Sequence, residues 1–156
     1  MAIERARAHL ESVGLADRII ETSESSHTVE LAAAALGIGP ERIAKTLAFL
    51  VDGCPVLVVA AGDARVDNKG FKDQFGVKAR MIPGEDVERL VGHAPGGTCP
   101  FGVEPDVEVW LDSSLKRFDE VYPAAGNAAS GVRLSLDELE RASGSRGWVT
   151  VAKLPE

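Results

Sequence analysis

The strongest signal in the pattern of apolar and polar positions is a pair of apolar runs separated by turn residues. Residues 45–51 read KTLAFLV and residues 55–61 read PVLVVAA, with Asp52-Gly53 after the first run. An Asp-Gly pair is typical of the tight turn that joins two antiparallel strands. The pattern therefore predicts a β-hairpin, and both of its strands are apolar enough to be largely buried.

Apolar residues at helical spacing predict helices on both sides of this hairpin. The first runs from Ile3 to Val13 and ends near Gly14, and the second spans residues 29–36, with Thr28 as its N-cap. Further helical segments are expected after Pro40, at residues 67–75, after Pro83, and after Ser135, where Ser135 and Glu138 form a capping box.

Short alternating segments predict further strands in the second half of the chain. They read ARMI at 79–82, VEVWL at 107–111, FDEVY at 118–122, GVRLS at 131–135 and WVTVA at 148–152. Strands and helices interleave, but the hairpin joins two strands directly. The sheet must therefore be mixed, in a fold of the α/β class.

Length and composition predict one globular domain over residues 1–156. The chain is 45% apolar and 26% charged, which is enough apolar residue to bury a continuous core. No run of about 18 apolar residues is present, and the N-terminus is charged, so we expect a cytoplasmic protein without a membrane partner. Cys54 and Cys99 lie in no disulfide or metal-ligand pattern, so no metal and no cofactor are expected.

The charge distribution excludes a protein that coats nucleic acid unspecifically. The formal net charge is −7, whereas such binding depends on neutralising phosphates with lysine and arginine. Residues 65–80 nevertheless have a local charge of +3, because five basic residues outnumber Asp67 and Asp73. The five are Arg65, Lys69, Lys72, Lys78 and Arg80. This window is either a solvated helix face or a local patch that faces phosphates.

Two features are candidates for chemistry. Lys45 shares a strand face with Leu47 and Phe49. Its ammonium either extends to solvent from the strand end or lies at the rim of a pocket. At a pocket rim it can bind phosphate or polarise a carbonyl. The loop at 96–102 reads GGTCPFG. It is either a simple turn or a segment whose backbone N–H groups bind an oxyanion.

Four segments together resemble the YbaK-type aminoacyl-tRNA deacylases, which are similar to the editing insertion of bacterial prolyl-tRNA synthetase. They read AKTL at 44–47, GDARVDNKGFKDQFG at 62–76, GHAPGGTCPFG at 92–102 and LDSSLKRFDEVYPAAGN at 111–127. The resemblance extends from about residue 31 to residue 139, and four segments in the same order are far more specific than any one of them. It implies a compact mixed α/β fold around a curved, barrel-like sheet surrounded by helices, and activity without a metal.

The resemblance also implies roles for individual residues. The lysine of the first segment is required for deacylation in that family, which assigns catalysis to Lys45. The glycine loop shapes the amino-acid pocket, with the N–H of Gly97 as an oxyanion donor. The other residues expected to bind the substrate are Gly96, Thr98, Cys99, Pro100, Phe101, Asp63, Arg65 and Gly126. Lys69, Lys72, Lys78 and Arg80 are expected to face the tRNA acceptor stem.

Some family features have no counterpart in this chain. The synthetase insertion has a histidine in the segment where this chain reads Gly126-Asn127-Ala128, and cysteine-specific members have an N-terminal tyrosine, whereas Tyr122 is the only tyrosine here. The amino acid removed therefore stays open. His93 and His27 are either general bases or structural loop residues, and no histidine stands in a sequence relation to Cys99 that indicates a nucleophile.

These observations together predict a freestanding trans-editing hydrolase. Its reaction would be cleavage of the ester bond of mischarged aminoacyl-tRNA, with a small amino acid on tRNA-Pro or a similar tRNA as substrate. Water or the substrate's own ribose hydroxyl would act near the ester carbonyl. Prolyl-tRNA synthetase or an elongation factor is the expected protein partner, and DNA is not a partner. The alternative is an inactive tRNA-binding or regulatory module of the same fold.

Overall fold

The predicted hairpin forms the centre of a six-stranded sheet. The computed structural model describes residues 2–22, 29–93, 98–126 and 129–154. Strands β2 (Ile43–Val51) and β3 (Cys54–Ala61) pair antiparallel along their lengths, from Val51 opposite Cys54 to Ala44 opposite Ala61. Asp52 and Gly53 between them have positive φ values of 52° and 81°, as the tight turn of a hairpin requires.

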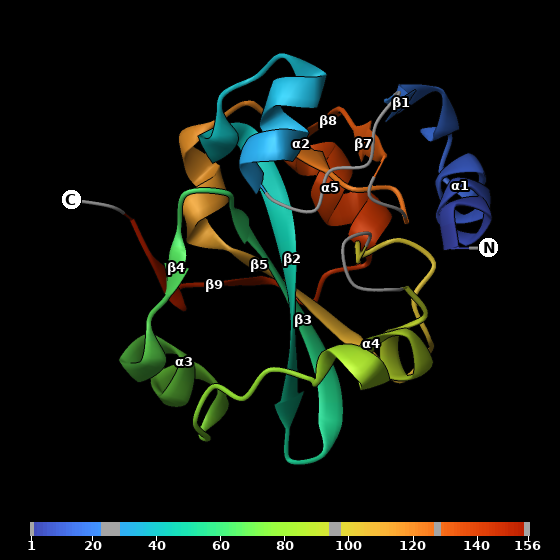
Figure 1. Ribbon diagram of the computed structural model, residues 1–156. Coiled ribbons are helices and arrows are strands. Elements are labelled where there is room, and N and C mark those ends of the chain that lie inside the picture. Colours follow the sequence, from blue (N-terminus) through green and yellow to red (C-terminus); the bar gives the residue numbers. More distant parts are fainter. Residues whose placement is uncertain (1, 23–28, 94–97, 127–128, 155–156) are drawn as a thin grey trace.

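The other strands extend this hairpin on both sides into a curved mixed sheet (Figure 1). Its order is β8-β6-β2-β3-β5-β9, in which β6 pairs parallel to β2, while β5 and β9 continue parallel to β3. The bounds are β5 Glu108–Asp112, β6 Glu120–Pro123, β8 Leu134–Ser135 and β9 Trp148–Val149. The expected mixed, curved sheet with surrounding helices is confirmed.

Two small antiparallel pairs lie beside the main sheet. β1 (Ile19–Glu21) pairs with β7 (Ser130–Val132), and β4 (Arg65–Val66) pairs with β10 (Ala152–Lys153). The sequence pattern predicted neither β1 nor β4, because a strand of two or three residues is too short to show alternation.

Among the residues that the structure describes, five helices surround the sheet. They are α1 (Ala2–Ser12), α2 (Val29–Leu36), α3 (Asn68–Phe75), α4 (Gly84–Val91) and α5 (Leu136–Ser143), with 3-10 turns η1 (Ala16–Arg18), η2 (Pro40–Arg42) and η3 (Ser113–Arg117). The capping box of α5 is present, because Ser135 Oγ accepts from the Glu138 N–H at 3.2 Å and Glu138 Oε1 accepts from the Ser135 N–H at 2.9 Å. No helix within the described ranges is long and apolar enough to cross a membrane.

The two faces of the hairpin pack into separate apolar clusters. Ala44 and Ala48 belong to the larger cluster, whereas Phe49 belongs to the smaller one. In the smaller cluster, Phe71 of α3 packs on Phe49 with ring centroids 4.6 Å apart, and Phe75 follows at 4.7 Å from Phe71. Side chains alternate along a strand, so α3 covers the face of β2 on which Lys45 lies.

Three predicted strands differ from the observed ones. ARMI forms only an isolated bridge between Met81 and Phe49, because Pro83 starts α4 directly afterwards. GVRLS divides into β7 and β8, which belong to different sheets. WVTVA divides into β9 and β10, because the buried carboxylate of Asp112 accepts the N–H groups of Val151 and Ala152 at 2.8 and 3.1 Å in place of a neighbouring strand.

Candidate functional site

Lys45 lies at the beginning of β2 with its ammonium group held by two backbone carbonyls. Its Nζ donates to the carbonyl oxygen of Gly62 at 3.3 Å and to that of Ala64 in a shorter contact. A lysine ammonium has three hydrogen donors, so one remains for a ligand beyond these two bonds. The side chain is half-buried, and its ammonium lies against the backbone that directly follows β3.

The carbonyls that hold Lys45 belong to a tight turn at residues 61–64, directly after β3. The Ala64 N–H donates to the Ala61 carbonyl at 3.0 Å, which closes the turn. Asp63 lies within it, and both oxygens of its carboxylate accept from Arg117, at 2.6 and 3.1 Å. Ser114 also reaches the turn, since its Oγ accepts from the Ala61 N–H at 3.0 Å. Two residues of η3 therefore fix the turn.

The charges around Lys45 alter the ionisation of the site. Burial lowers the pKa of the Lys45 ammonium below its usual range, while the carboxylates of Asp63 and Glu30 raise it and Arg65 lowers it further. The hydrogen bonds from Arg117 hold the pKa of Asp63 below its usual range, against the opposing effect of partial burial. The structure thus brings the predicted residues Lys45, Asp63 and Arg65 into one charged group.

A second group contains the residues of the glycine loop that lie within the described ranges. Cys99, Pro100 and Phe101 are buried, and Thr98 is half-exposed. Cys99 and Phe101 pack in the larger apolar cluster, on the face of β2 opposite Lys45. The backbone of Gly126 lies against the Cys99 thiol. Gly96 and Gly97 fall outside the described residues, as does His27.

His93 lies beside Cys99, a neighbour that sequence spacing did not indicate. Its Nε2 is 3.5 Å from the Cys99 sulfur and 2.6 Å from the Phe101 carbonyl oxygen. A carbonyl can only accept, so Nε2 carries the proton and donates it to Phe101, and it cannot take a proton from the thiol. Burial lowers the pKa of His93 and raises the pKa of Cys99 to about 12. Both side chains of the pair are therefore uncharged at neutral pH.

This protonation state predicts how the two cysteines react. Cys54 is exposed and Cys99 is buried, and only a thiolate is a strong nucleophile. We expect iodoacetamide at neutral pH to alkylate Cys54 alone in the folded protein, as peptide mass analysis would show. We also expect Cys99→Ser to retain the deacylation rate of the parent within about tenfold, since Cys99 takes no part in covalent catalysis in the expected mechanism. Rapid labelling of Cys99, or an acyl group trapped on its sulfur, would contradict this assignment.

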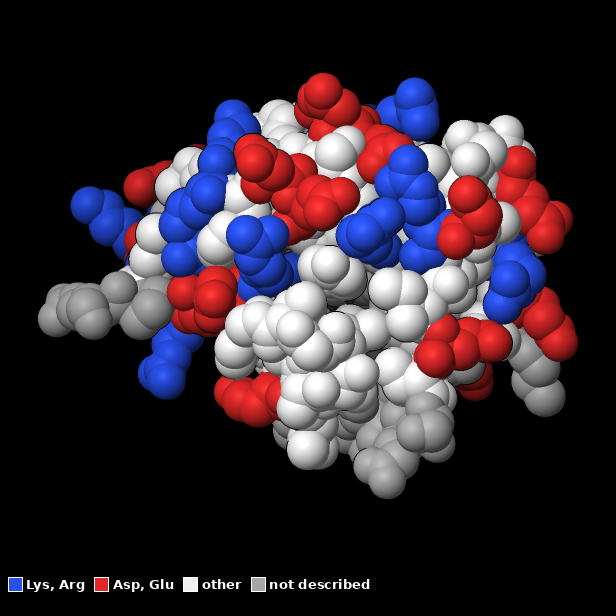
Figure 2. All heavy atoms as spheres, turned by 90° about the horizontal axis from the view of Figure 1, so that it is seen from above, with Lys and Arg blue, Asp and Glu red and all other residues white. Residues whose placement is uncertain are grey.

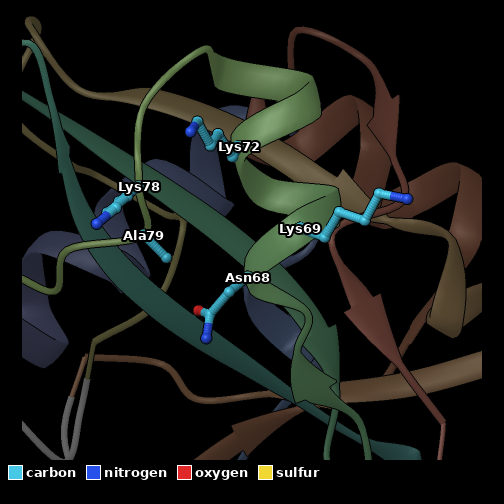
Figure 3. A pocket seen from close by; sticks show the side chains of 5 residues that line it. All are labelled: Asn68, Lys69, Lys72, Lys78 and Ala79. Atoms are coloured by element: carbon cyan, nitrogen blue, oxygen red, sulfur yellow. The ribbon is translucent and has the colours of Figure 1, made fainter.

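A third group surrounds a cavity of about 530 Å³ beside α3, which we call the lysine cavity. It is lined by Asn68, Lys69, Lys72, Lys78 and Ala79 (Figure 3). Lys72 and Lys78 extend on one side of the helix, whereas the ammonium of Lys69 extends to the other. Arg80 is exposed and is not part of this lining. Three of the four residues predicted to face tRNA therefore line one cavity, although the ammonium of Lys69 extends away from the other two, and no acidic side chain belongs to the described lining.

The charge on the surface nearest α2 is mixed in sign. Figure 2, which views the molecule from above, shows basic and acidic side chains interleaved over its upper half and an uncharged area in its centre. The exposed residues of α2, which include Leu31 and Ala34, are consistent with this uncharged area. The described part of this face therefore offers a nucleic acid no continuous basic surface.

Sequence reasoning missed Arg117 and Ser114. Both lie in the segment at 111–127 that carries the family resemblance, but Arg117 is 54 positions from Asp63. No spacing rule connects two residues so far apart, and only the packing of η3 against the turn does so. Within the described ranges, no group of three or more histidine, cysteine or acidic side chains is arranged to hold a metal ion.

Comparisons with known proteins indicate the family of this chain. A family model described as the aminoacyl-tRNA editing domain matches residues 23–142. The protein YwhH of Bacillus subtilis (strain 168), which is itself uncharacterized, is 44% identical over 154 residues, with 98% of both chains covered. Proline--tRNA ligase of Bacillus licheniformis is 32% identical over 108 residues, which are 69% of this chain and 18% of the ligase.

Two further proteins have names that specify an activity. A candidate Cys-tRNA(Pro)/Cys-tRNA(Cys) deacylase of Enterococcus faecalis, EbsC, is 28% identical over 119 residues, covering 75% of this chain and 73% of that protein. The crystal structure of a candidate trans-editing enzyme for prolyl-tRNA synthetase superposes with a TM-score of 0.88 at 27% identity, covering 97% of both chains. With a family model matched over most of its length, this chain belongs to the aminoacyl-tRNA editing domain family.

Proposed function

We propose that this protein is a freestanding deacylase that hydrolyses the ester bond of mischarged aminoacyl-tRNA. The observation that carries the proposal is the half-buried ammonium of Lys45, held by the carbonyls of Gly62 and Ala64 with one donor left for a ligand. In a member of the editing family, that donor has an evident acceptor among the oxygens of the aminoacylated 3′ end.

In the proposed mechanism the protein supplies position and electrostatics. Lys45 binds a phosphate or ribose oxygen of the terminal adenosine, or polarises the ester carbonyl, and so favours the charge that develops on the carbonyl oxygen. Water, oriented by the substrate's own ribose hydroxyl, attacks the carbonyl carbon; the bond to the ribose oxygen breaks, and that oxygen takes the proton. The N–H of Gly97 and its neighbours would stabilise the oxyanion, with Gly96, Thr98 and Pro100 shaping the amino-acid pocket.

The acceptor strand would extend from Lys45 toward the lysine cavity. Phe49 is four residues beyond Lys45 on the same face of β2, which corresponds to about 13 Å along the strand. Phe71 of α3 packs on Phe49, and the same helix carries Lys72 on the cavity wall. Lys45 and the cavity are therefore on one face of the sheet, within reach of a single nucleic-acid strand. Arg65 and Arg80 would contribute at the edges of this path.

This path predicts which variants weaken tRNA binding through charge. Lys72→Ala and Lys78→Ala should each lower affinity for aminoacyl-tRNA and reduce the slope of log K against log salt concentration by about 1, because each removes one phosphate contact. Single-turnover rates at saturating enzyme should change little. Binding would be measured between 50 and 200 mM salt, with Arg141→Ala on the exposed surface of α5 as the control. An unchanged slope in both lysine variants would remove the cavity from the path.

A panel of charged tRNAs tests the proposed function. The protein would be incubated with alanyl-, seryl-, cysteinyl- and prolyl-tRNA-Pro and with the cognate alanyl- and cysteinyl-tRNAs, with and without EDTA, and loss of the ester would be followed. We expect at least one mischarged tRNA to be hydrolysed, at a rate unaffected by EDTA. Tight binding without hydrolysis of any member would instead support the inactive tRNA-binding module.

The panel also addresses specificity. A pocket that separates alanine from serine or cysteine differs by one or two small contacts, and tRNA-Pro is the substrate that the likeness to proline--tRNA ligase favours. That likeness also supports prolyl-tRNA synthetase as a partner. None of the relatives described above bears on an elongation factor, which stays a prediction from the sequence.

A further inference from the structure

The bidentate contact between Arg117 and Asp63 lies directly against the turn that holds Lys45. Asp63 stands between Gly62 and Ala64, whose carbonyls accept from the Lys45 ammonium. Its carboxylate is close enough for its charge to act on that ammonium. Arg117 binds both carboxylate oxygens, at 2.6 and 3.1 Å, while its Nε donates to the Ser114 carbonyl at 3.0 Å. The guanidinium is thus fixed at three atoms.

We propose that Arg117 is a positioning residue for the proposed deacylation. Because Arg117 binds both carboxylate oxygens of Asp63, this carboxylate does not pair with Lys45. The third hydrogen donor of the Lys45 ammonium is thereby left for the substrate. The expected effect of Arg117 on the deacylation rate rests on the proposed function. The expected effect of Arg117 on the pKa of Lys45 does not, because it can be measured without a substrate.

The geometry favours this role over one in stability. Ion pairs near the surface contribute little to folding, and the side chains of Arg117 and Asp63 are 33% and 24% exposed. Other ion pairs of the described surface, such as Arg5 with Glu104 or Arg7 with Glu21, consist of one hydrogen bond. A planar fork that engages both carboxylate oxygens instead fixes an orientation.

The consequence of releasing Asp63 follows from the charges around Lys45. The charged groups that act on the ammonium are Asp63, Arg65 and Glu30 of α2. Without Arg117, the freed carboxylate would become the nearest strong acceptor. A direct pair would raise the pKa of Lys45 and fill the donor that the substrate needs. Removing the carboxylate as well would eliminate this competitor.

The test compares Arg117→Ala, Asp63→Asn and the double variant. We expect Arg117→Ala to lower the single-turnover rate by about 10- to 100-fold, with little change in tRNA affinity. The double variant should be faster than Arg117→Ala, because the competing charge is absent. Arg133→Ala, which removes an exposed ion pair with Glu120 at 3.8 Å, is the control and should act at the parental rate.

A second readout does not depend on activity. The chain has only six lysines, so their NMR signals can be resolved in protein labelled at the lysine ε-carbon. A Lys45→Arg sample assigns the signal of Lys45, whose pKa is then measured by titration. We expect the pKa of Lys45 to rise in Arg117→Ala and to fall in Asp63→Asn. If Arg117→Ala does not fold, Arg117→Lys, which keeps the charge but loses the fork, should show the same shifts to a smaller degree.

The outcomes separate the two proposals. If no tRNA of the panel is hydrolysed but the pKa of Lys45 shifts in opposite directions, the proposed function fails while the link between Arg117 and Lys45 stands. If the parent is active and Arg117→Ala acts at the parental rate, the positioning role is overturned. It is equally overturned if the double variant is no faster than Arg117→Ala and the pKa of Lys45 stays unchanged, because Arg117 would then only support the fold.

Discussion

Lys45→Ala is expected to lower single-turnover deacylation by about 100-fold or more while leaving the protein folded. The variant removes an ammonium whose remaining donor faces the reacting ester in the proposed mechanism, and losing one such electrostatic contact commonly costs 10²- to 10³-fold in rate. The effect on stability should be about 1 kcal/mol, because the carbonyls of Gly62 and Ala64 each lose one donor at a half-buried position.

Two matched variants make this result specific. Lys45→Arg keeps the charge but presents a larger planar fork to the carbonyls that fit a compact ammonium, so we expect it to be impaired as well. Arg141→Ala removes an exposed cation from α5 and should act at the parental rate. Single-turnover deacylation and thermal melting would be measured on the same samples. A folded Lys45→Ala protein with the parental rate would show that Lys45 is only a strand-end lysine that extends toward solvent.

Much of the fold could be predicted because its main elements have local signals. The hairpin at 43–61 has two apolar runs and an Asp-Gly turn, and α5 has its capping box. The pattern was wrong where tertiary contacts replaced strand pairing. The segment WVTVA has the alternation of one strand, but the buried carboxylate of Asp112 takes two of its N–H groups and divides it between two sheets. A buried acidic residue 39 positions away has no local signature.

The candidate site was predictable one segment at a time. Lys45 was found because a cation on an apolar strand face is unusual, and the structure shows its ammonium held by backbone carbonyls. The residues that fix the turn around this ammonium could not be predicted. Arg117 and Ser114 reach the turn from η3, and no sequence spacing indicates how η3 packs. Conversely, Cys99 and Phe101 belong to the glycine loop that suggested ligand contact, and both lie in the apolar core. Their place in the substrate pocket stays a prediction.

Gly62→Ala is expected to reduce both activity and stability, because the turn that holds Lys45 has no room for a side chain at position 62. A Cβ at this position would lie 2.1 Å from the carbonyl oxygen of Pro40 and 2.7 Å from Cγ1 of Val29. The first of these atoms is backbone and cannot rotate away. The turn would therefore shift away from η2 and α2 and move the Lys45 ammonium with it.

The expected size of the effect follows from this displacement. Overpacking of this kind commonly costs about 1–3 kcal/mol, which corresponds to a decrease in melting temperature of several degrees for a chain of this length. A shift of about 1 Å in a catalytic group can cost about 100-fold in rate. Because the loss of rate acts through Lys45, Gly62→Ala should cause little further loss in a protein that already carries Lys45→Ala.

Gly39→Ala is the matched control for this substitution. Gly39 also has an ordinary backbone conformation, with φ −72°, and the three atoms nearest to a Cβ there would be those of the Glu41 carboxylate, the first at 2.2 Å. That carboxylate can rotate away, so stability should stay within about 1 kcal/mol of the parent and activity should be unchanged. Both variants would be compared by thermal melting and single-turnover deacylation. If Gly62→Ala melts and reacts like Gly39→Ala, the turn at 61–64 tolerates displacement, and its carbonyls do not set the position of Lys45.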